Sequence, residues 1–290
     1  MIRHNAKAAR WVLTAPLFIF LALAVVYPIY YGIQTSLQQR SLLDPAPSWA
    51  GVDNFTAVLK DTGFWHAVSF TLKFTVVATA LEIVLGFLLA LLMNKHFPGR
   101  KKLLSFLIMP VMIAPALMGV MFRLLLNSDI GIVPALLDKV GISISLFSND
   151  TVVPLLVVLD VLQWTPFAFL LFYSGLQTVP QDLYEAASVD GAGYFRTIRS
   201  VIIPLMLPIL FITGFLRAID AFRTFDVIYI LTGGGPGDQT TTVSIYIYKA
   251  FATGNFGTAS AAAILAAILM LPLVPVVVRR LAAPEKKADR

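Results

Sequence analysis

The sequence of 290 residues contains no cysteine and only three histidines. The lack of cysteine excludes disulfides, thiolate metal sites and cysteine nucleophiles. The histidines fall in terminal or loop positions, so we expect no histidine-built metal or catalytic centre. Charged residues make up only 13% of the chain. A Walker A motif, the glycine-rich loop followed by Lys and Ser or Thr that cradles nucleotide phosphates, is absent as well. The chain therefore has no P-loop ATPase site of its own.

Apolar residues dominate what is present. They account for 58% of the chain, and the mean hydropathy of +0.81 is far above that of soluble globular proteins. A bilayer-crossing helix requires roughly 20 apolar residues. Segments of that kind lie near 11–33, 69–93, 103–126, 151–176, 201–222 and 256–278. We therefore predict an all-α, polytopic membrane protein that forms a single transmembrane domain over residues 1–290, with six spanning helices.

The first apolar segment must be distinguished from a cleaved signal peptide. It follows Arg3, Lys7 and Arg10 and contains Ala-Leu-Ala at 22–24, which resembles a cleavage site. The apolar run nevertheless continues past this triplet to Tyr31 with no polar region before it. We expect the segment to remain as a membrane helix.

Basic residues are distributed unevenly between the two sides of the predicted spans. Fourteen lie before span one, between spans two and three, between spans four and five, and after span six, whereas the alternate loops hold four. Cytoplasmic loops carry an excess of Lys and Arg. We therefore predict cytoplasmic termini, a cytoplasmic loop at 179–200, and outward-facing loops near 34–68, 127–150 and 224–255. The same asymmetry accounts for the net charge of +6 without a nucleic-acid partner.

The polar segment 179–208 predicts a short helix followed by a turn. Pro180 suits a first helical position, and Asp182 and Glu185 place negative charge where the helix dipole favours it. Gly191 can end the helix in a left-handed conformation. The spacing of the apolar residues within this helix predicts that they share one face. These residues are Leu183, Ala186 and Ala187.

A second helix is predicted from near Tyr194, running without a break into the span from Val201. A short helix that is rigidly connected to a spanning helix can transmit a displacement from outside the bilayer to the membrane-spanning part. The alternatives are an ordinary helical hairpin or a DNA-binding helix-turn-helix. A DNA-binding element would not be fused to a bilayer span, which argues against the second of these.

This segment resembles the EAA loop of bacterial ABC importer permeases, whose pattern is E-A-A-x3-G-x9-I-x-L-P. The matching positions are Glu185, Ala186, Ala187, Gly191, Val201, Ile203 and Pro204. Val201 and Ile203 stand where the pattern has Ile and Leu, and both changes are conservative. The stretches 190–193 and 231–236 further resemble carbohydrate-type permeases of the maltose and glycerol-phosphate kind.

The resemblance implies a type I ABC importer permease subunit in the bacterial inner membrane. It implies a second homologous permease subunit, two ATPase subunits that bind ATP and Mg²⁺, and an external solute-binding protein. It also implies inward movement of a sugar or sugar derivative, with no cofactor bound by this chain. The residues expected to couple it to the ATPases are Glu185, Ala186, Ala187, Asp190 and Gly191.

Span four carries a polar and aromatic stripe: Asp160, Gln163, Trp164 and Phe167 follow helical spacing and share one face. A carboxylate and an amide can bond sugar hydroxyls, and an indole offers a flat apolar plate for a sugar ring. In maltose-type relatives the same stretch contributes to the sugar site, so the resemblance supports this location for a substrate path. A buried interhelical network is the alternative. Leu156 is expected to face lipid.

Other ionisable residues also fall within spans, where they are costly unless they face a cavity or a partner. We expect Glu82 in span two to bond a neighbouring helix. At the end of span five, Arg217, Asp220, Arg223 and Asp226 follow each other at intervals of three, which allows ion pairs along one helix face. An unpaired arginine here would instead suit an anionic sugar derivative.

Two other classes of function compete with this prediction. A secondary transporter driven by an ion gradient, for small polar solutes, would more often show inverted repeats and interrupted helices. A membrane enzyme would require a nucleophile, a metal site or an acid–base cluster, and none stands out in the sequence.

Overall fold

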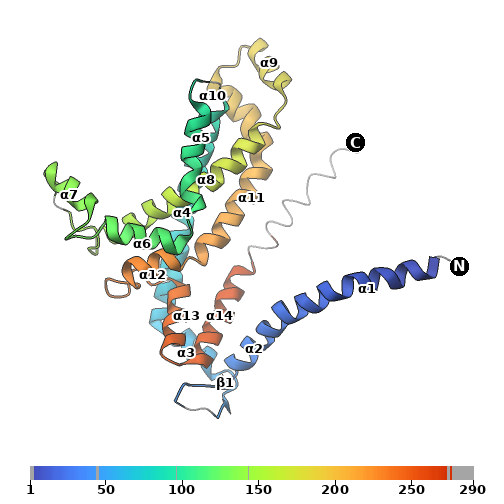
Figure 1. Cartoon of the computed structure of the whole chain (residues 1–290), viewed down its shortest axis with the longest axis vertical. Coiled ribbons are helices and arrows are strands. Elements are labelled where there is room, and N and C mark those ends of the chain that lie inside the picture. Colours follow the sequence, from blue (N-terminus) through green and yellow to red (C-terminus); the bar gives the residue numbers. More distant parts are fainter. Residues whose placement is uncertain (1–2, 44–45, 96, 143, 273–274, 276–290) are drawn as a thin grey trace. The chain divides into compact units, whose positions relative to one another are not determined.

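The computed structural model describes residues 3–43, 46–95, 97–142, 144–272 and 275, and their regular structure is almost entirely helical (Figure 1). The longer helices are α1 (Arg3–Leu21), α2 (Tyr27–Ser36), α4 (Thr62–Asn94), α6 (Pro115–Leu125), α8 (Val152–Leu176), α11 (Ile203–Phe222), α13 (Val243–Ala252) and α14 (Phe256–Met270). The shorter ones are α3 (Asp53–Lys60), α5 (Arg100–Ile108), α7 (Ile132–Lys139), α9 (Gln181–Val189), α10 (Tyr194–Thr197) and α12 (Asp226–Thr232). Two short strands, β1 (Gln38–Gln39) and β2 (Ser48–Trp49), pair antiparallel.

Four helical segments are long and apolar enough to cross a membrane, and they coincide with predicted spans one, two, four and five. These segments are Trp11–Ser36, Thr62–Asn94, Val152–Leu176 and Tyr194–Thr232. The all-α prediction is confirmed. The predicted sixth span, 256–278, corresponds to α14, which has 15 residues. Most of the remainder of that span lies outside the described residues.

The predicted third span is not one straight helix. α5 continues into a 3-10 turn, and α6 then leaves at an angle of 98°. Pro115 lacks the N–H that would continue the ladder of hydrogen bonds, and its ring forces Ala114 into an extended conformation with ψ 138°. Hydropathy could not predict this bend, because it reports the composition of a segment and not its direction.

Two helices contain a π-helical turn that precedes a proline. Ala22–Val26 ends just before Pro28, and Ile198–Ile202 ends just before Pro204. A proline removes one helical donor and crowds the preceding turn, and a π-turn absorbs this disturbance without ending the helix. The helix from Tyr194 therefore continues into α11, as predicted.

The chain divides into two compact units, one from the regions 1–64 and 246–269 and the other from 65–245 and 270–290. In the first unit, small residues of α14 allow the backbone to approach closely. A Cβ on Gly257 would lie 2.4 Å from the carbonyl oxygen of Gln38, and Ala261 and Ala262 are fully buried. The side-chain amide of Asn54 connects α3 to β1 by donating to the carbonyl of Gln38 at 2.9 Å.

The second unit contains helices α4, α8 and α11, which pack closely because small residues lie at their contacts. A Cβ on Gly86 of α4 would lie 2.9 Å from the Cβ of Ala168 in α8. One on Gly175 of α8 would lie 2.4 Å from Ile209 of α11. Close approach of this kind is what holds helices together in lipid.

The expectation that Leu156 faces lipid is wrong. Its side chain is 1% exposed and lies in a core cluster with Phe74 and Ile228. Helical periodicity identifies residues that share a face, but which face meets other helices depends on their packing. Leu162 on the same helix is 51% exposed and is the better lipid-facing position.

Candidate functional site

Arg217 of α11 is the centre of a buried cluster of charges. Its Nε donates to Oε2 of Glu82 at 2.6 Å, and its Nη2 donates to Oε1 at 2.8 Å. This fork-to-fork geometry is the strongest form of an arginine–carboxylate pair. Both side chains are buried, at 1% and 0% exposed. The expectation that Glu82 bonds a neighbouring helix is confirmed, and the bond is an ion pair between α4 and α11.

Two further carboxylates and an indole surround the same guanidinium. Nη1 lies 2.6 Å from Oδ2 of Asp220, and Nη2 lies 3.3 Å from Oδ2 of Asp160 in α8. The ring centroid of Trp164 is 4.6 Å from the guanidinium carbon, a distance typical of a cation–π contact. One guanidinium therefore joins α4, α8 and α11, and no intrahelical spacing could have revealed this.

The predicted ion-pair ladder along α11 is present only in part. Asp220 accepts from Arg217 and also from Arg223, whose Nη2 lies 3.0 Å from Oδ1. Arg223 is 72% exposed, so the outer pair is screened by solvent. Asp226 lies beyond the end of α11, in the first turn of α12.

Gln163 has a structural role at the bend between α5 and α6. Its Nε2 donates to the carbonyl oxygen of Ile113 at 3.2 Å. Ile113 has an extended backbone, and Pro115 beyond it brings no N–H to the helical ladder. The amide thus satisfies a carbonyl left without a helical donor, and Gln163 does not line the cavity described next.

A cavity of about 410 Å³ opens beside the charged cluster. Its polar lining comes from Asp160, Trp164, Asp220, Arg223 and Asp226. Two of the four residues predicted to line a substrate path, Asp160 and Trp164, therefore do line a cavity.

Phe167 contacts Trp164 and is not among the residues that line this cavity. Its ring contacts that of Trp164 edge to face, with centroids 6.4 Å apart. Of the four residues in the stripe on α8, two line the cavity, one binds the carbonyl at the helix bend, and one packs against Trp164.

The predicted coupling residues lie on and just after α9. Gly191 follows this helix with φ +68°, which confirms the expected left-handed turn. The backbone N–H of Ala192 closes the turn by donating to the carbonyl of Ala187 at 2.9 Å. Pro180 precedes the first helical residue rather than occupying it. Asp190, next to the turn, is exposed.

The face of α9 that packs against the protein differs from the predicted one. Ala187 is buried and Tyr184 is half-buried, and this burial raises the pKa of Tyr184. Leu183, Glu185 and Ala186 are exposed. The spacing predicted one apolar face for Leu183, Ala186 and Ala187, but only Ala187 of these is buried, and Tyr184 is the second residue that packs inward.

Large apolar side chains are exposed around the same turn. Val189 is 88% exposed and Phe195 is 84% exposed. Tyr194, at 48% exposed, is held beneath the ammonium group of Lys95, whose Nζ lies 4.4 Å from the ring centroid. The start of the long helix into α11 is thereby connected to the end of α4.

Comparisons with known proteins agree with this architecture. The family described as "Binding-protein-dependent transport system inner membrane component" matches residues 82–284, more than half of the chain. The trehalose/maltose transport system permease protein MalF of Thermococcus litoralis is 33% identical over 93% of this chain and 92% of its own length. The trehalose transport system permease protein SugA of Mycobacterium tuberculosis is 33% identical over 91% of this chain and 85% of its own.

A solved bacterial ABC transporter that imports the acidic polysaccharide alginate shares the fold. One of its chains superimposes with a TM-score of 0.84 at 22% identity, covering 98% of this chain and 100% of that one. The chain therefore belongs to the family of inner membrane components of binding-protein-dependent transport systems, as a permease subunit of an ABC importer.

Proposed function

We propose that this permease moves a sugar or sugar derivative inward as one of two homologous permease subunits. An external solute-binding protein delivers the ligand, and two partner ATPase subunits bind ATP and Mg²⁺. The observation that carries the proposal is the cavity lined by Asp160 and Trp164 in a chain whose relatives include permeases named for trehalose and maltose. Membership of this family argues against the alternative of a transporter driven by an ion gradient.

The chemistry of the cavity favours an uncharged, hydroxyl-rich ligand. The lining includes three carboxylate side chains, which accept hydrogen bonds from hydroxyls, and the indole plate of Trp164. Arg217, which could otherwise attract an anion, already has Glu82, Asp160 and Asp220 as partners. An anionic sugar derivative would therefore meet mainly negative charge in the cavity, and we propose that such ligands are disfavoured.

The exposed surface of α9 is proposed to dock onto an ATPase subunit. Exposed apolar side chains near polar ones mark protein interaction surfaces. Leu183, Ala186 and Val189 are exposed beside Glu185. Closure of the ATPases would push α9, and the unbroken helix from Tyr194 would carry the displacement into α11.

The topology proposed from the basic residues places both termini and α9 in the cytoplasm, within a single permease domain. Since the native chain has no cysteine, single cysteines can report on sidedness. In intact cells, Val140→Cys, at a position 69% exposed, is expected to react with an impermeant thiol reagent. Ser188→Cys, also at an exposed position, is expected to react only after permeabilisation. Labelling of Ser188→Cys from outside would contradict this topology.

The substrate path is tested by shortening the residues that line the cavity. Trp164→Ala and Asp160→Ala are expected to lower the affinity for transported sugar several-fold without abolishing uptake, since one hydrogen bond to a ligand contributes about 0.5–1.5 kcal/mol. The measurement is uptake per assembled complex in proteoliposomes. Leu162→Ala, at an exposed position on the same helix, is the matched control and should behave as the wild type.

Asp160 also contributes to the charged cluster, so loss of stability must be separated from loss of binding. Melting temperatures of the purified complexes provide this separation. If both variants melt at lower temperature while uptake per complex stays at the wild-type level, the two residues are packing elements and the substrate assignment is wrong.

A further inference from the structure

A second cavity lies between the start of α5 and Tyr173, near the end of α8, and plays no part in the transport path proposed above. It has a volume of about 880 Å³. Gly99, with φ +87°, turns the chain into α5, so that Arg100, Lys101 and Lys102 form the first turn of that helix. The remaining lining side chains, Phe97, Pro98, Leu104 and Tyr173, are apolar or aromatic. None of the described residues that line this cavity carries a carboxylate.

Among the residues that the structure describes, no carboxylate pairs with the cations of this basic cavity. Arg100 donates to the hydroxyl of Tyr173, and its guanidinium carbon lies 5.3 Å from the centroid of that ring. Its Nε is buried and has no hydrogen-bond partner within the part of the chain that the structure describes. Lys101 and Lys102 are exposed, and neither forms a salt bridge to any other described residue. The described side chains around this cavity therefore carry a net positive charge.

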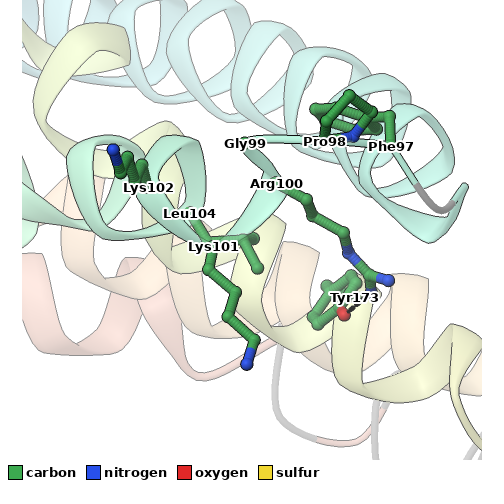
Figure 2. A pocket seen from close by; sticks show the side chains of 8 residues that line it. All are labelled: Phe97, Pro98, Gly99, Arg100, Lys101, Lys102, Leu104 and Tyr173. Carbon is green, nitrogen blue, oxygen red and sulfur yellow. Dashed lines mark hydrogen bonds between the residues drawn. The ribbon is translucent and has the colours of Figure 1, made fainter.

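The side chains divide the cavity into two chemical zones. Figure 2 shows the side chains of Arg100 and Lys101 extending to the same side of α5, with the guanidinium beside Tyr173, whereas Lys102 points away from them. Leu104 lies one turn farther along α5, on the side of Arg100 and Lys101, and it lines the same cavity together with Phe97 and Pro98. An anionic group held by Arg100 and Lys101 would therefore adjoin the apolar part of the cavity lining.

We propose that this basic cavity binds the headgroup of an anionic phospholipid. The basic residues place the start of α5 at the cytoplasmic surface, where the leaflet carries anionic lipids, and basic pockets between membrane helices on this side bind such headgroups. The headgroup phosphate lies against Arg100 and Lys101, and the start of an acyl chain contacts Leu104. A soluble anion would gain nothing from the apolar part of the lining.

Native mass spectrometry of the full-length permease complex in a neutral detergent tests the proposal. Phosphatidylglycerol and phosphatidylcholine are titrated in parallel, and bound lipid is counted per complex. The wild type is expected to retain phosphatidylglycerol preferentially. Each basic residue near an anionic surface contributes about a fivefold change in affinity, so Lys101→Gln should weaken phosphatidylglycerol binding about fivefold, and Arg100→Gln with Lys101→Gln about 25-fold.

The matched control is Lys139→Gln, which removes an exposed cation in the last turn of α7, in a loop predicted to face outward. It should leave phosphatidylglycerol binding unchanged. Lys101 is exposed, and its replacement leaves the contact between Arg100 and Tyr173 in place. Lys101→Gln therefore tests lipid binding even if the double variant does not fold. Equal retention of the two lipids, or wild-type retention in Lys101→Gln, would overturn the proposal. So would displacement of the lipid by millimolar inorganic phosphate, or loss of ATPase subunits from Lys101→Gln with lipid binding intact.

Discussion

Replacement of Arg217 with leucine is expected to destabilise the protein by about 3–5 kcal/mol, because it leaves the carboxylates of Glu82 and Asp160 buried without a partner. Glu82 is 0% exposed, and both of its oxygens accept from this one guanidinium. Lipid provides no substitute donor. After extraction from the membrane, the amount of folded, monodisperse protein should fall strongly. The melting temperature of the protein that remains folded should fall as well. Both are measured by fluorescence-detected size-exclusion chromatography.

Arg223→Leu is the matched control, since Arg223 pairs with the same Asp220 but is 72% exposed. An exposed pair contributes only about 0–1 kcal/mol, so this variant should melt close to the wild type. Replacing Glu82 and Arg217 together by leucine should recover part of the lost stability, because no unpaired carboxylate then remains at that position. If Arg217→Leu melts like Arg223→Leu, the cluster does not hold the three helices together.

Glu185→Lys and Gly191→Leu are expected to abolish uptake while membrane insertion stays intact. Glu185 is exposed on α9, and reversing its charge changes the surface proposed to meet the ATPase. Gly191 has φ +68°, where a leucine side chain costs about 1–2 kcal/mol and reorients the turn. Uptake in proteoliposomes and co-purification of the ATPase subunits are measured together, at equal expression.

Gly193 offers a matched control for this turn. A Cβ would meet open space at both glycines, but Gly193 has φ −66°, which any residue adopts. Gly193→Leu should therefore retain uptake where Gly191→Leu loses it. Wild-type uptake in both Glu185→Lys and Gly191→Leu would show that this segment does not couple the permease to ATP hydrolysis.

The features that were predicted correctly depend on short stretches of chain. Hydropathy over some twenty residues located spans one, two, four and five, and Gly191 was recognised because few other residues adopt its left-handed conformation. The continuous helix from Tyr194 into α11 was expected because its sequence contains no stop signal, and Pro204 only induces a π-turn. Each of these outcomes follows from backbone preference or from the cost of exposing polar groups to lipid.

The features that were missed depend on how helices are rotated against each other. Equal spacing made Asp160 and Gln163 look alike, yet one meets Arg217 and the other meets the carbonyl of Ile113. Leu156 was placed on the wrong side of α8 for the same reason. Periodicity defines which residues share a face, whereas the neighbouring helices decide what that face contacts.

By itself, the sequence determined that the chain is a multi-pass helical membrane protein with a short polar helix next to a span, because these properties arise from local backbone chemistry and transfer into lipid. Only the tertiary structure decided which charges pair and where cavities open. Arg217 reaches Asp160 and Glu82 across separations of 57 and 135 residues. The partners at such distances are selected by packing, since a buried guanidinium is stable only where the fold brings carboxylates to it.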